Sequence, residues 1–131
     1  MNDSKQNTSQ SGRRRETRSS GGFRLYDDAI ALVRMLAPLW REVGKHNRRL
    51  KQQLEDAACS VPANVQEGRC RWNGHGRNRL ETAMQSAREC IGHLETAEAA
   101  GYLTREDIAA AVDHADKVVA TAWKCLYRTR R

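Results

Sequence analysis

The chain lacks any apolar run near the ~20 residues that a membrane-spanning helix needs. Its polar N-terminus also lacks the apolar core of a secretory signal peptide. No segment alternates apolar and polar residues between turn signals, so β-strands are not expected. These absences favour a protein that is built of helices and does not span a membrane.

The sequence also shows none of the common catalytic or phosphate-binding motifs. No Ser-His-Asp or Cys-His arrangement is recognisable, and no glycine-rich loop would hold a phosphate. A nuclease would need a cluster of carboxylates, and none stands at a useful spacing. We therefore expect a protein without enzymatic activity and without a cofactor.

The cysteines form no C-x-x-C pair; they are Cys59, Cys70, Cys90 and Cys125. Three of them fall on or beside apolar helical stripes, where a reduced cysteine behaves as a small hydrophobe. This usage favours a reducing, cytoplasmic compartment. Cys90 and His93 lie one helical turn apart, with His75 in a nearby predicted loop, so zinc is chemically conceivable. Because zinc sites normally show clustered ligand pairs, we expect no metal.

The net charge of the 131 residues is +7. Such a balance favours an acidic partner, most simply nucleic acid, with RNA preferred over DNA. An anionic membrane surface ranks second and is not our prediction. The alternative is that the charge only keeps a small protein soluble.

Residues 1–22 contain no large apolar side chain after Met1, so no core can form there. Arg13, Arg14 and Arg15 precede a Ser-Ser-Gly-Gly run. We predict a disordered basic arm over 1–22 and a helical domain over 23–131. An Arg/Ser-rich transit segment is the alternative interpretation of the arm.

Apolar residues spaced by three and four predict two helices, over about 25–45 and 47–70. Asp27 and Asp28 are expected in the first turn of the first helix, where the helix dipole favours anions. Asn47 is the expected N-cap of the second helix. Pro38 and Pro62 should each kink their helix, because proline removes a backbone hydrogen bond.

The same spacing predicts two more helices, over about 78–100 and from Thr104 onward. Gly101 is a natural residue to end the third helix. Thr104 and Asp107 have the spacing of a capping box, and Leu103 with Ile108 has that of a hydrophobic staple.

Four amphipathic helices with short connections predict an all-α fold, an up-down-up-down four-helix bundle. The apolar stripes are rich in alanine and bury little area per residue. Additional burial between subunits would compensate, so we expect a homo-oligomer.

The second and third predicted helices carry a recognisable order of residues. The matching positions are Leu50, Gln53, Leu54, Ala57, Ser60, Val61, Pro62, Ala63, Asn64, Glu67 and Gly68, followed by Ala87-Arg88, Leu94-Glu95-Thr96 and Gly101-Tyr102-Leu103. This order resembles the family named after proteins encoded in 23S rRNA intervening sequences. The resemblance covers about residues 23–127.

That family is similar in fold to the accessory variability determinant of diversity-generating retroelements. There, a homopentameric barrel of basic bundles works with a reverse transcriptase and its template RNA. The resemblance therefore implies a bundle, a homopentamer, and a role with nucleic acid or a ribonucleoprotein. The intervening-sequence branch itself carries no established biochemical activity.

The connection after Gly68 looks longer and more basic than is usual in the family, and residues 68–80 include no acidic residue. In an up-down-up-down bundle this connection shares one end with both chain termini. Glu98, Glu106 and Asp107 are expected near the opposite end. We predict a charge-polarised bundle whose basic end binds phosphates. The predicted contact residues are Arg13, Arg14, Arg15, Arg69, Arg71, Trp72, Arg77, Arg79, Lys124, Arg128, Arg130 and Arg131.

Two questions stay open at this point. Trp72 either stacks on an unpaired base, assisted by His75, or packs into an interface. The function is either nucleic-acid binding, as an accessory to a reverse transcriptase, or protein-interaction scaffolding in which the charge is incidental. Asn64 and Glu67 are predicted to be structural residues near the Pro62 kink, with a catalytic carboxylate as the alternative.

Overall fold

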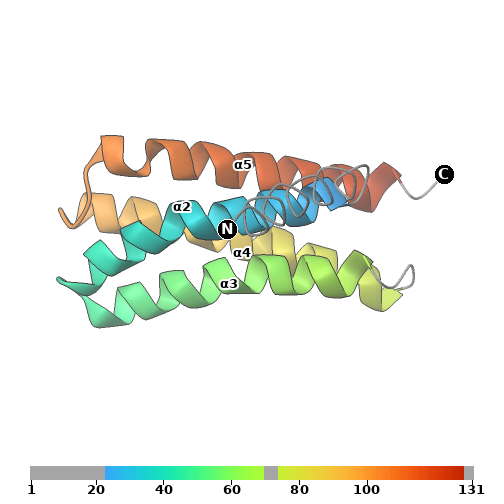
Figure 1. The fold of residues 1–131 in the computed structure, drawn as a ribbon, viewed down its shortest axis with the longest axis horizontal. Helices are drawn as coiled ribbons and strands as arrows, with labels where there is room; N and C mark the ends of the chain where they lie inside the picture. The colour runs from blue at the N-terminus through green and yellow to red at the C-terminus, as the bar shows by residue number, and fades with distance from the viewer. Residues whose placement is uncertain (1–22, 70–73, 129–131) are drawn as a thin grey trace, which may run out of the picture.

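The computed structural model describes residues 23–69 and 74–128, apart from the side chains of Phe23, Arg69 and Arg128. These residues form four helices and no strands, which confirms the all-α prediction (Figure 1). The helices are α2 (Phe23–Gly44), α3 (Arg48–Arg69), α4 (Gly74–Ala99) and α5 (Arg105–Arg128). The predicted basic arm lies outside the described residues.

The helices run alternately up and down, and each packs against its neighbours in the chain (Figure 1). The ring closes where α2 packs against α5. The bundle therefore has two distinct ends. We call the end with the α2–α3 and α4–α5 connections, residues 45–47 and 100–104, the turn end. The opposite end, where α2 and α4 begin and α3 and α5 finish, is the terminal end.

The core lies along the bundle axis and is built from the predicted apolar stripes. Its largest fully buried side chains are Leu25, Leu32, Leu36, Leu54, Leu94, Leu126, Val43, Val61, Val65, Val118 and Cys90. Alanines fill much of the remaining helix contact, with Ala29, Ala58 and Ala87 fully buried. Val33, Ile91 and Val119 are only half-buried, because the apolar arc of each helix is wider than the arc that faces the axis.

Two predicted helix starts are wrong. α2 begins at Phe23, so Asp27 and Asp28 lie beyond its first turn, which contains no acidic residue. α4 begins at Gly74, so the stretch predicted as a loop is helical from there on and includes His75. Only residues 70–73 stand between α3 and α4.

A close approach of α3 and α4 accounts for the early start of α4. A Cβ built on Gly68 would lie 2.9 Å from the backbone oxygen of Gly76 and 2.8 Å from Leu80 Cγ. Gly76 is itself buried. The two helices can only meet this closely because glycine has no side chain, and the contact holds residues 74–80 against the end of α3.

The predicted caps are confirmed. The Leu50 amide donates to Asn47 Oδ1 at 2.9 Å. At the start of α5 the Thr104 amide donates to Asp107 Oδ2, and the Asp107 amide donates to Thr104 Oγ1. Gly101 ends α4 with a φ of 83°, a left-handed conformation that glycine adopts without strain.

Both prolines lie inside continuous helices, α2 and α3. Next to Pro62, Asn64 Nδ2 donates to the backbone oxygen of Ser60 at 2.8 Å and to Ser60 Oγ at 2.9 Å. Ser60 Oγ in turn lies 2.9 Å from Ser86 Oγ on α4. Asn64 thus has a structural role within α3, as predicted, and the Ser60 hydroxyl links α3 to α4.

Candidate nucleic-acid interface

Most of the predicted contact residues cannot be placed by their side chains. The positions outside the described residues are Arg13, Arg14, Arg15, Arg71, Trp72, Arg130 and Arg131. Arg69 and Arg128 are the last residues of α3 and α5, and their side chains are not described. Arg77, Arg79 and Lys124 remain, and all three lie at the terminal end.

Of these three, Arg77 has a structural partner. Its Nη1 donates to the backbone oxygen of Leu126 at 2.7 Å and so ties α4 to the last turn of α5. Carbonyls in the last turn of a helix have no partner within the helix, and the guanidinium supplies one with a favourable charge. Arg79 and Lys124 are exposed. Arg79 and Lys124, together with Arg24 in the first turn of α2, therefore present exposed cationic groups in the described part of this end.

The predicted charge polarisation stays a prediction, because most of the basic side chains assigned to the terminal end lie outside the described part of the chain. Glu98, Glu106 and Asp107 do lie at the turn end, as expected. That end, however, also carries exposed basic residues that sequence reasoning missed, four of them close together in the sequence. We call these four the turn cluster: Arg41, Lys45, Arg48 and Arg49.

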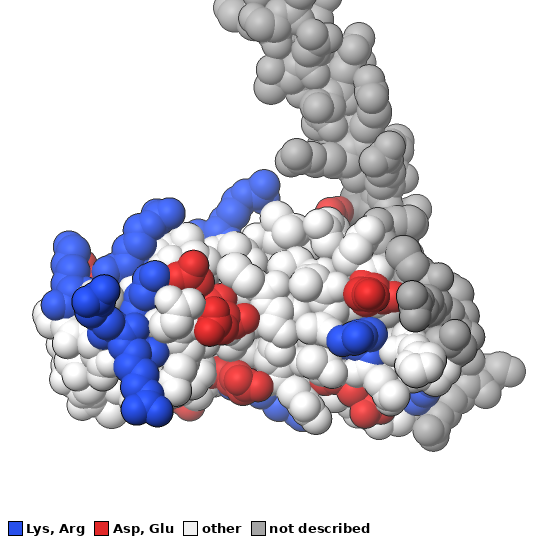
Figure 2. All heavy atoms as spheres, turned by 90° about the horizontal axis from the view of Figure 1, so that it is seen from below, with Lys and Arg blue, Asp and Glu red and all other residues white. Residues whose placement is uncertain are grey.

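The turn cluster spans the last turn of α2, the connection, and the first turn of α3. Figure 2 shows basic side chains gathered at this end of the visible face, with most of the visible acidic side chains further along the bundle. The signal was present in the sequence, where four cations fall within nine residues, 41–49. It was overlooked because the cations straddle a helix boundary, so that only the turn brings them together.

Three of the described lysines pair with carboxylates, whereas the described arginines do not. Lys45 Nζ lies 3.1 Å from Glu42 Oε1, Lys51 Nζ 2.6 Å from Glu55 Oε1, and Lys117 Nζ 3.8 Å from Asp113 Oδ2. The hydrogen bond and charge of Lys45 lower the pKa of the Glu42 carboxyl. Among the described side chains no arginine takes part in an ion pair. The exposed guanidinium groups are thus open to an external anion, whereas that of Arg77 is bonded to the backbone of α5.

An aromatic pair joins the two connections of the turn end. The His46 ring stacks on the Tyr102 ring with centroids 5.2 Å apart and planes 8° from parallel. His46 Nε2 also lies 3.5 Å from Glu42 Oε2, and 44% of the His46 side chain is exposed. Beside the pair is a groove of about 320 Å³, lined by Leu39, Glu42, Gly101, Tyr102, Leu103, Thr104 and Asp107. One face of the His46 ring is therefore covered by Tyr102, while the side chain as a whole stays partly exposed to solvent.

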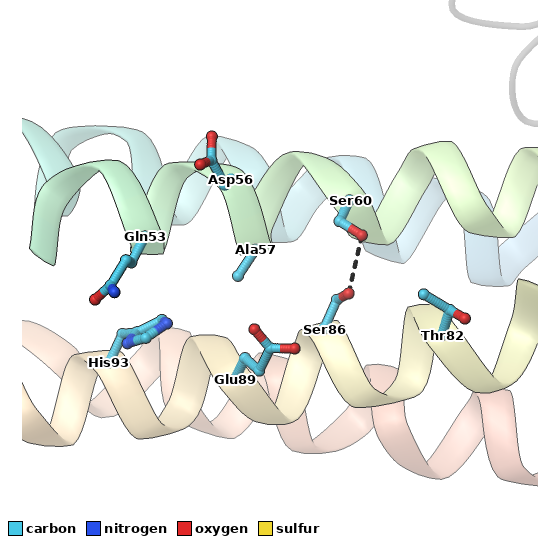
Figure 3. A pocket seen from close by; sticks show the side chains of 8 residues that line it. All are labelled: Gln53, Asp56, Ala57, Ser60, Thr82, Ser86, Glu89 and His93. Atoms are coloured by element: carbon cyan, nitrogen blue, oxygen red, sulfur yellow. Dashed lines mark hydrogen bonds between the residues drawn. The ribbon is translucent and has the colours of Figure 1, made fainter. Parts of the chain in front are cut away.

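A second, larger groove of about 500 Å³ lies between α3 and α4. Figure 3 shows the hydroxyl pair of Ser60 and Ser86 joining the two helices, with Glu89 and His93 on α4 and Asp56 pointing away from α4. The carboxylates of Asp56 and Glu89 do not converge on one point. Within the described residues no group of three His, Cys, Asp or Glu side chains is placed to hold a metal ion.

The conceivable zinc ligands do not converge. Cys90 is fully buried in the core, and burial raises the pKa of its thiol to about 12. His93 faces the α3–α4 groove instead, and His75 is exposed in the first turn of α4. A thiol that stays protonated is a poor metal ligand, so burial explains Cys90 as a core residue.

The four-helix arrangement and its residues can now be compared with known proteins. The sequence profile of a family described as 23S rRNA-intervening sequence protein matches residues 23–123. The chain belongs to this family. No curated protein matches it significantly in sequence. A solved structure similar to this intervening-sequence protein is the crystal structure of a protein of unknown function from the S23 ribosomal protein family of Bacteroides thetaiotaomicron.

That structure superposes with a TM-score of 0.73 at 17% identity, over 79% of this chain and 98% of the other. At this identity it shows the shared fold alone. The family match of the intervening-sequence protein ends at Trp123, so it includes the turn cluster and the His46–Tyr102 pair. It excludes Lys124 and everything after it, and it excludes residues 1–22. The predicted similarity to the accessory variability determinant stays a prediction.

No helix among the described residues combines the length and the low charge of a membrane-spanning segment.

Proposed function

We propose that this protein is a non-enzymatic bundle that binds nucleic acid, RNA in particular. The observation that carries the proposal is the set of exposed arginines without an ion pair near the two ends of the bundle: Arg41, Arg48, Arg49 and Arg105 at the turn end, and Arg24 and Arg79 at the terminal end. An unpaired guanidinium keeps its planar set of donors for phosphate oxygens, which it binds in a bidentate manner.

The family description supports RNA over DNA, because it refers to sequences within 23S rRNA. An accessory role beside a reverse transcriptase is a narrower form of this proposal that rests on the resemblance alone. We also propose that the protein is not an enzyme. The carboxylates of Asp56 and Glu89, which do not converge in the α3–α4 groove, support this part of the proposal. Nuclease activity of the clean protein with added Mg²⁺ would contradict it.

We predict a steep dependence of RNA binding on salt. Each contacted phosphate of a single strand contributes about −0.7 to the slope of log K against log salt. Four contacted phosphates would weaken binding roughly fiftyfold between about 50 and 200 mM salt. Fluorescence anisotropy with a labelled RNA measures this slope. A peptide nucleic acid of the same base sequence has no phosphates and serves as the control, which should not bind. Salt-independent binding, or none, would contradict the proposal.

A second candidate function, an oligomeric interaction scaffold, is favoured by one observation. Trp123 and Tyr127 on α5 are 52% and 40% exposed, and their rings lie 4.7 Å apart. Exposed aromatic side chains of this size are typical of the buried centre of protein interfaces. This pair, together with the alanine-rich core, supports the proposed homo-oligomer, for which the resemblance implies a pentamer.

The scaffold proposal predicts that Trp123→Ala/Tyr127→Ala dissociates the oligomer. Each aromatic anchor of an interface contributes about 2 kcal/mol or more, so the dissociation constant should rise at least about thirtyfold. Sedimentation equilibrium measures the change. Lys117→Ala on the same helix alters an exposed residue and should leave the association unchanged. An unaltered oligomer in the double variant would place the interface elsewhere.

A further inference from the structure

The terminal end was the predicted binding surface, but the described residues concentrate a different combination of groups at the turn end. There, unpaired arginines lie close in the chain to a stacked ring that is partly exposed. Nucleic-acid strands that are not base-paired are recognised by this pairing of chemistries, in which cations hold the phosphates and flat rings stack on the bases.

We infer that the turn end binds an unpaired stretch of nucleic acid, with Arg48 and Arg49 on the phosphates and His46 stacked against a base. The inference rests on the proposed function and names the surface and the form of its ligand. Trp72, which was predicted to stack on a base, lies outside the described residues. His46 is therefore the ring for which the structure supplies a geometry.

The His46 ring is preorganised for stacking on a base. Its ring centroid lies 5.2 Å from that of Tyr102, with the planes 8° from parallel, and Tyr102 is half-buried in the connection between α4 and α5. The supporting ring fixes the plane of the imidazole, so a base that stacks on its other face does not have to order it first. Stacking on an aromatic ring is tolerant of base identity, because every base has a π-face.

Arg48 and Arg49 are the residues that we assign to the phosphates. Arg48 and Arg49 follow His46 by two and three residues, and both are exposed and without an ion pair. A strand whose base stacks on His46 would present successive phosphates nearby, and two long, exposed arginine side chains can reach toward them. Lys45 is less available, because Glu42 already holds its ammonium group.

No ion pair within the described part of the protein stabilises the charges of Arg48 and Arg49. They occupy the first turn of α3, where no acidic residue is present and the helix dipole disfavours positive charge. Their charge is unfavourable for the fold in isolation. An external anion offsets that disadvantage, so replacing them should weaken binding without destabilising the protein.

The test compares full-length variants in anisotropy titrations with a labelled twelve-nucleotide RNA strand and with the same strand in a duplex. Wild-type protein should prefer the single strand. Arg48→Glu/Arg49→Glu should weaken single-strand binding at least about tenfold, while the melting temperature stays equal or rises. The matched control is Arg34→Glu/Arg88→Glu, which changes the charge by the same amount midway along α2 and α4, and binding should change less than about threefold.

His46→Ala tests the stacking contact separately. Stacking contributes on the order of a fivefold to hundredfold gain per base, so single-strand affinity should fall within that range while duplex affinity is unchanged. Arg79→Glu/Lys124→Glu tests the terminal end in the same assay. If only this last variant loses binding, or if Arg48→Glu/Arg49→Glu behaves like its control, the inference is wrong and the proposed function stands. If wild-type protein binds no nucleic acid, the proposed function fails as well.

Discussion

Replacing Gly68 with alanine should destabilise the bundle by about 1–3 kcal/mol, although alanine is the better helix former. The added Cβ would lie 2.9 Å from the backbone oxygen of Gly76 and 2.8 Å from Leu80 Cγ. Leu80 can adjust its rotamer, but the Gly76 oxygen belongs to the backbone of α4. Relief of this contact therefore requires α3 and α4 to move apart, which opens the core around Leu80.

Gly92 offers the matched control for this prediction. It lies within α4, it is exposed, and a Cβ built there meets nothing within 4 Å. Gly92→Ala should stabilise the protein by up to about 1 kcal/mol through helix propensity alone. Urea unfolding followed by circular dichroism compares the two variants. Equal effects of the same sign would show that the close approach of α3 and α4 at Gly68 does not constrain the fold.

The second large effect is a loss of stability at alkaline pH that depends on Cys90. Burial raises the pKa of its thiol from 9.0 to about 12, and Glu89 and Cys59 add smaller contributions in the same direction. In the unfolded chain the thiol ionises at its ordinary pKa, whereas in the folded protein it stays neutral. The contribution is fully present below pH 9 and is lost as the pH rises toward 12. The loss is about 1.4 kcal/mol per pH unit, or about 3 kcal/mol by roughly pH 11.

Urea unfolding at a series of pH values between about 8 and 11 measures this loss under reducing conditions. Lysines and tyrosines titrate over the same range in every variant, so the informative quantity is the difference between wild-type protein and Cys90→Ala. Cys90→Ala should be less stable at pH 8, because it leaves a small cavity, but its stability should fall less steeply with pH. Parallel curves for the two proteins would contradict the assignment of the raised pKa to Cys90. Cys59 is exposed and serves as a comparison, since Cys59→Ala should follow wild-type protein more closely.

Local signals in the sequence predicted the helix ends only where the end is capped by its own neighbours. Asn47 and the Thr104–Asp107 pair are such cases, since their bonds span three residues. The start of α4 had no such signal. Residues 74–77 contain two glycines and looked like a loop, and they become helical because Gly76 is buried against Gly68. Contacts between helices outweighed the local preference of glycine.

The candidate site illustrates the same division. Charge counting predicted a basic binding surface on residues 68–80 and on the chain ends, and most of those basic side chains lie outside the described residues. Arg77 turned out to be bonded to the backbone of α5, a contact across 49 residues that no spacing rule reveals. The turn cluster lies on consecutive elements and was visible in the sequence. The stacking of His46 on Tyr102 was not, because the two residues meet only when the α2–α3 and α4–α5 turns share one end.

The amino-acid sequence by itself determined the helical class, the number of helices in the described region, and the caps at Asn47 and Thr104. These features depend on periodicity and on hydrogen bonds between near neighbours, which are properties of short segments. The tertiary structure alone decided where α4 begins, which arginines stay open to solvent, and which ring is held flat at the surface. Those features depend on the packing of one helix against another, and packing distances are set by residues that are remote from one another in the chain.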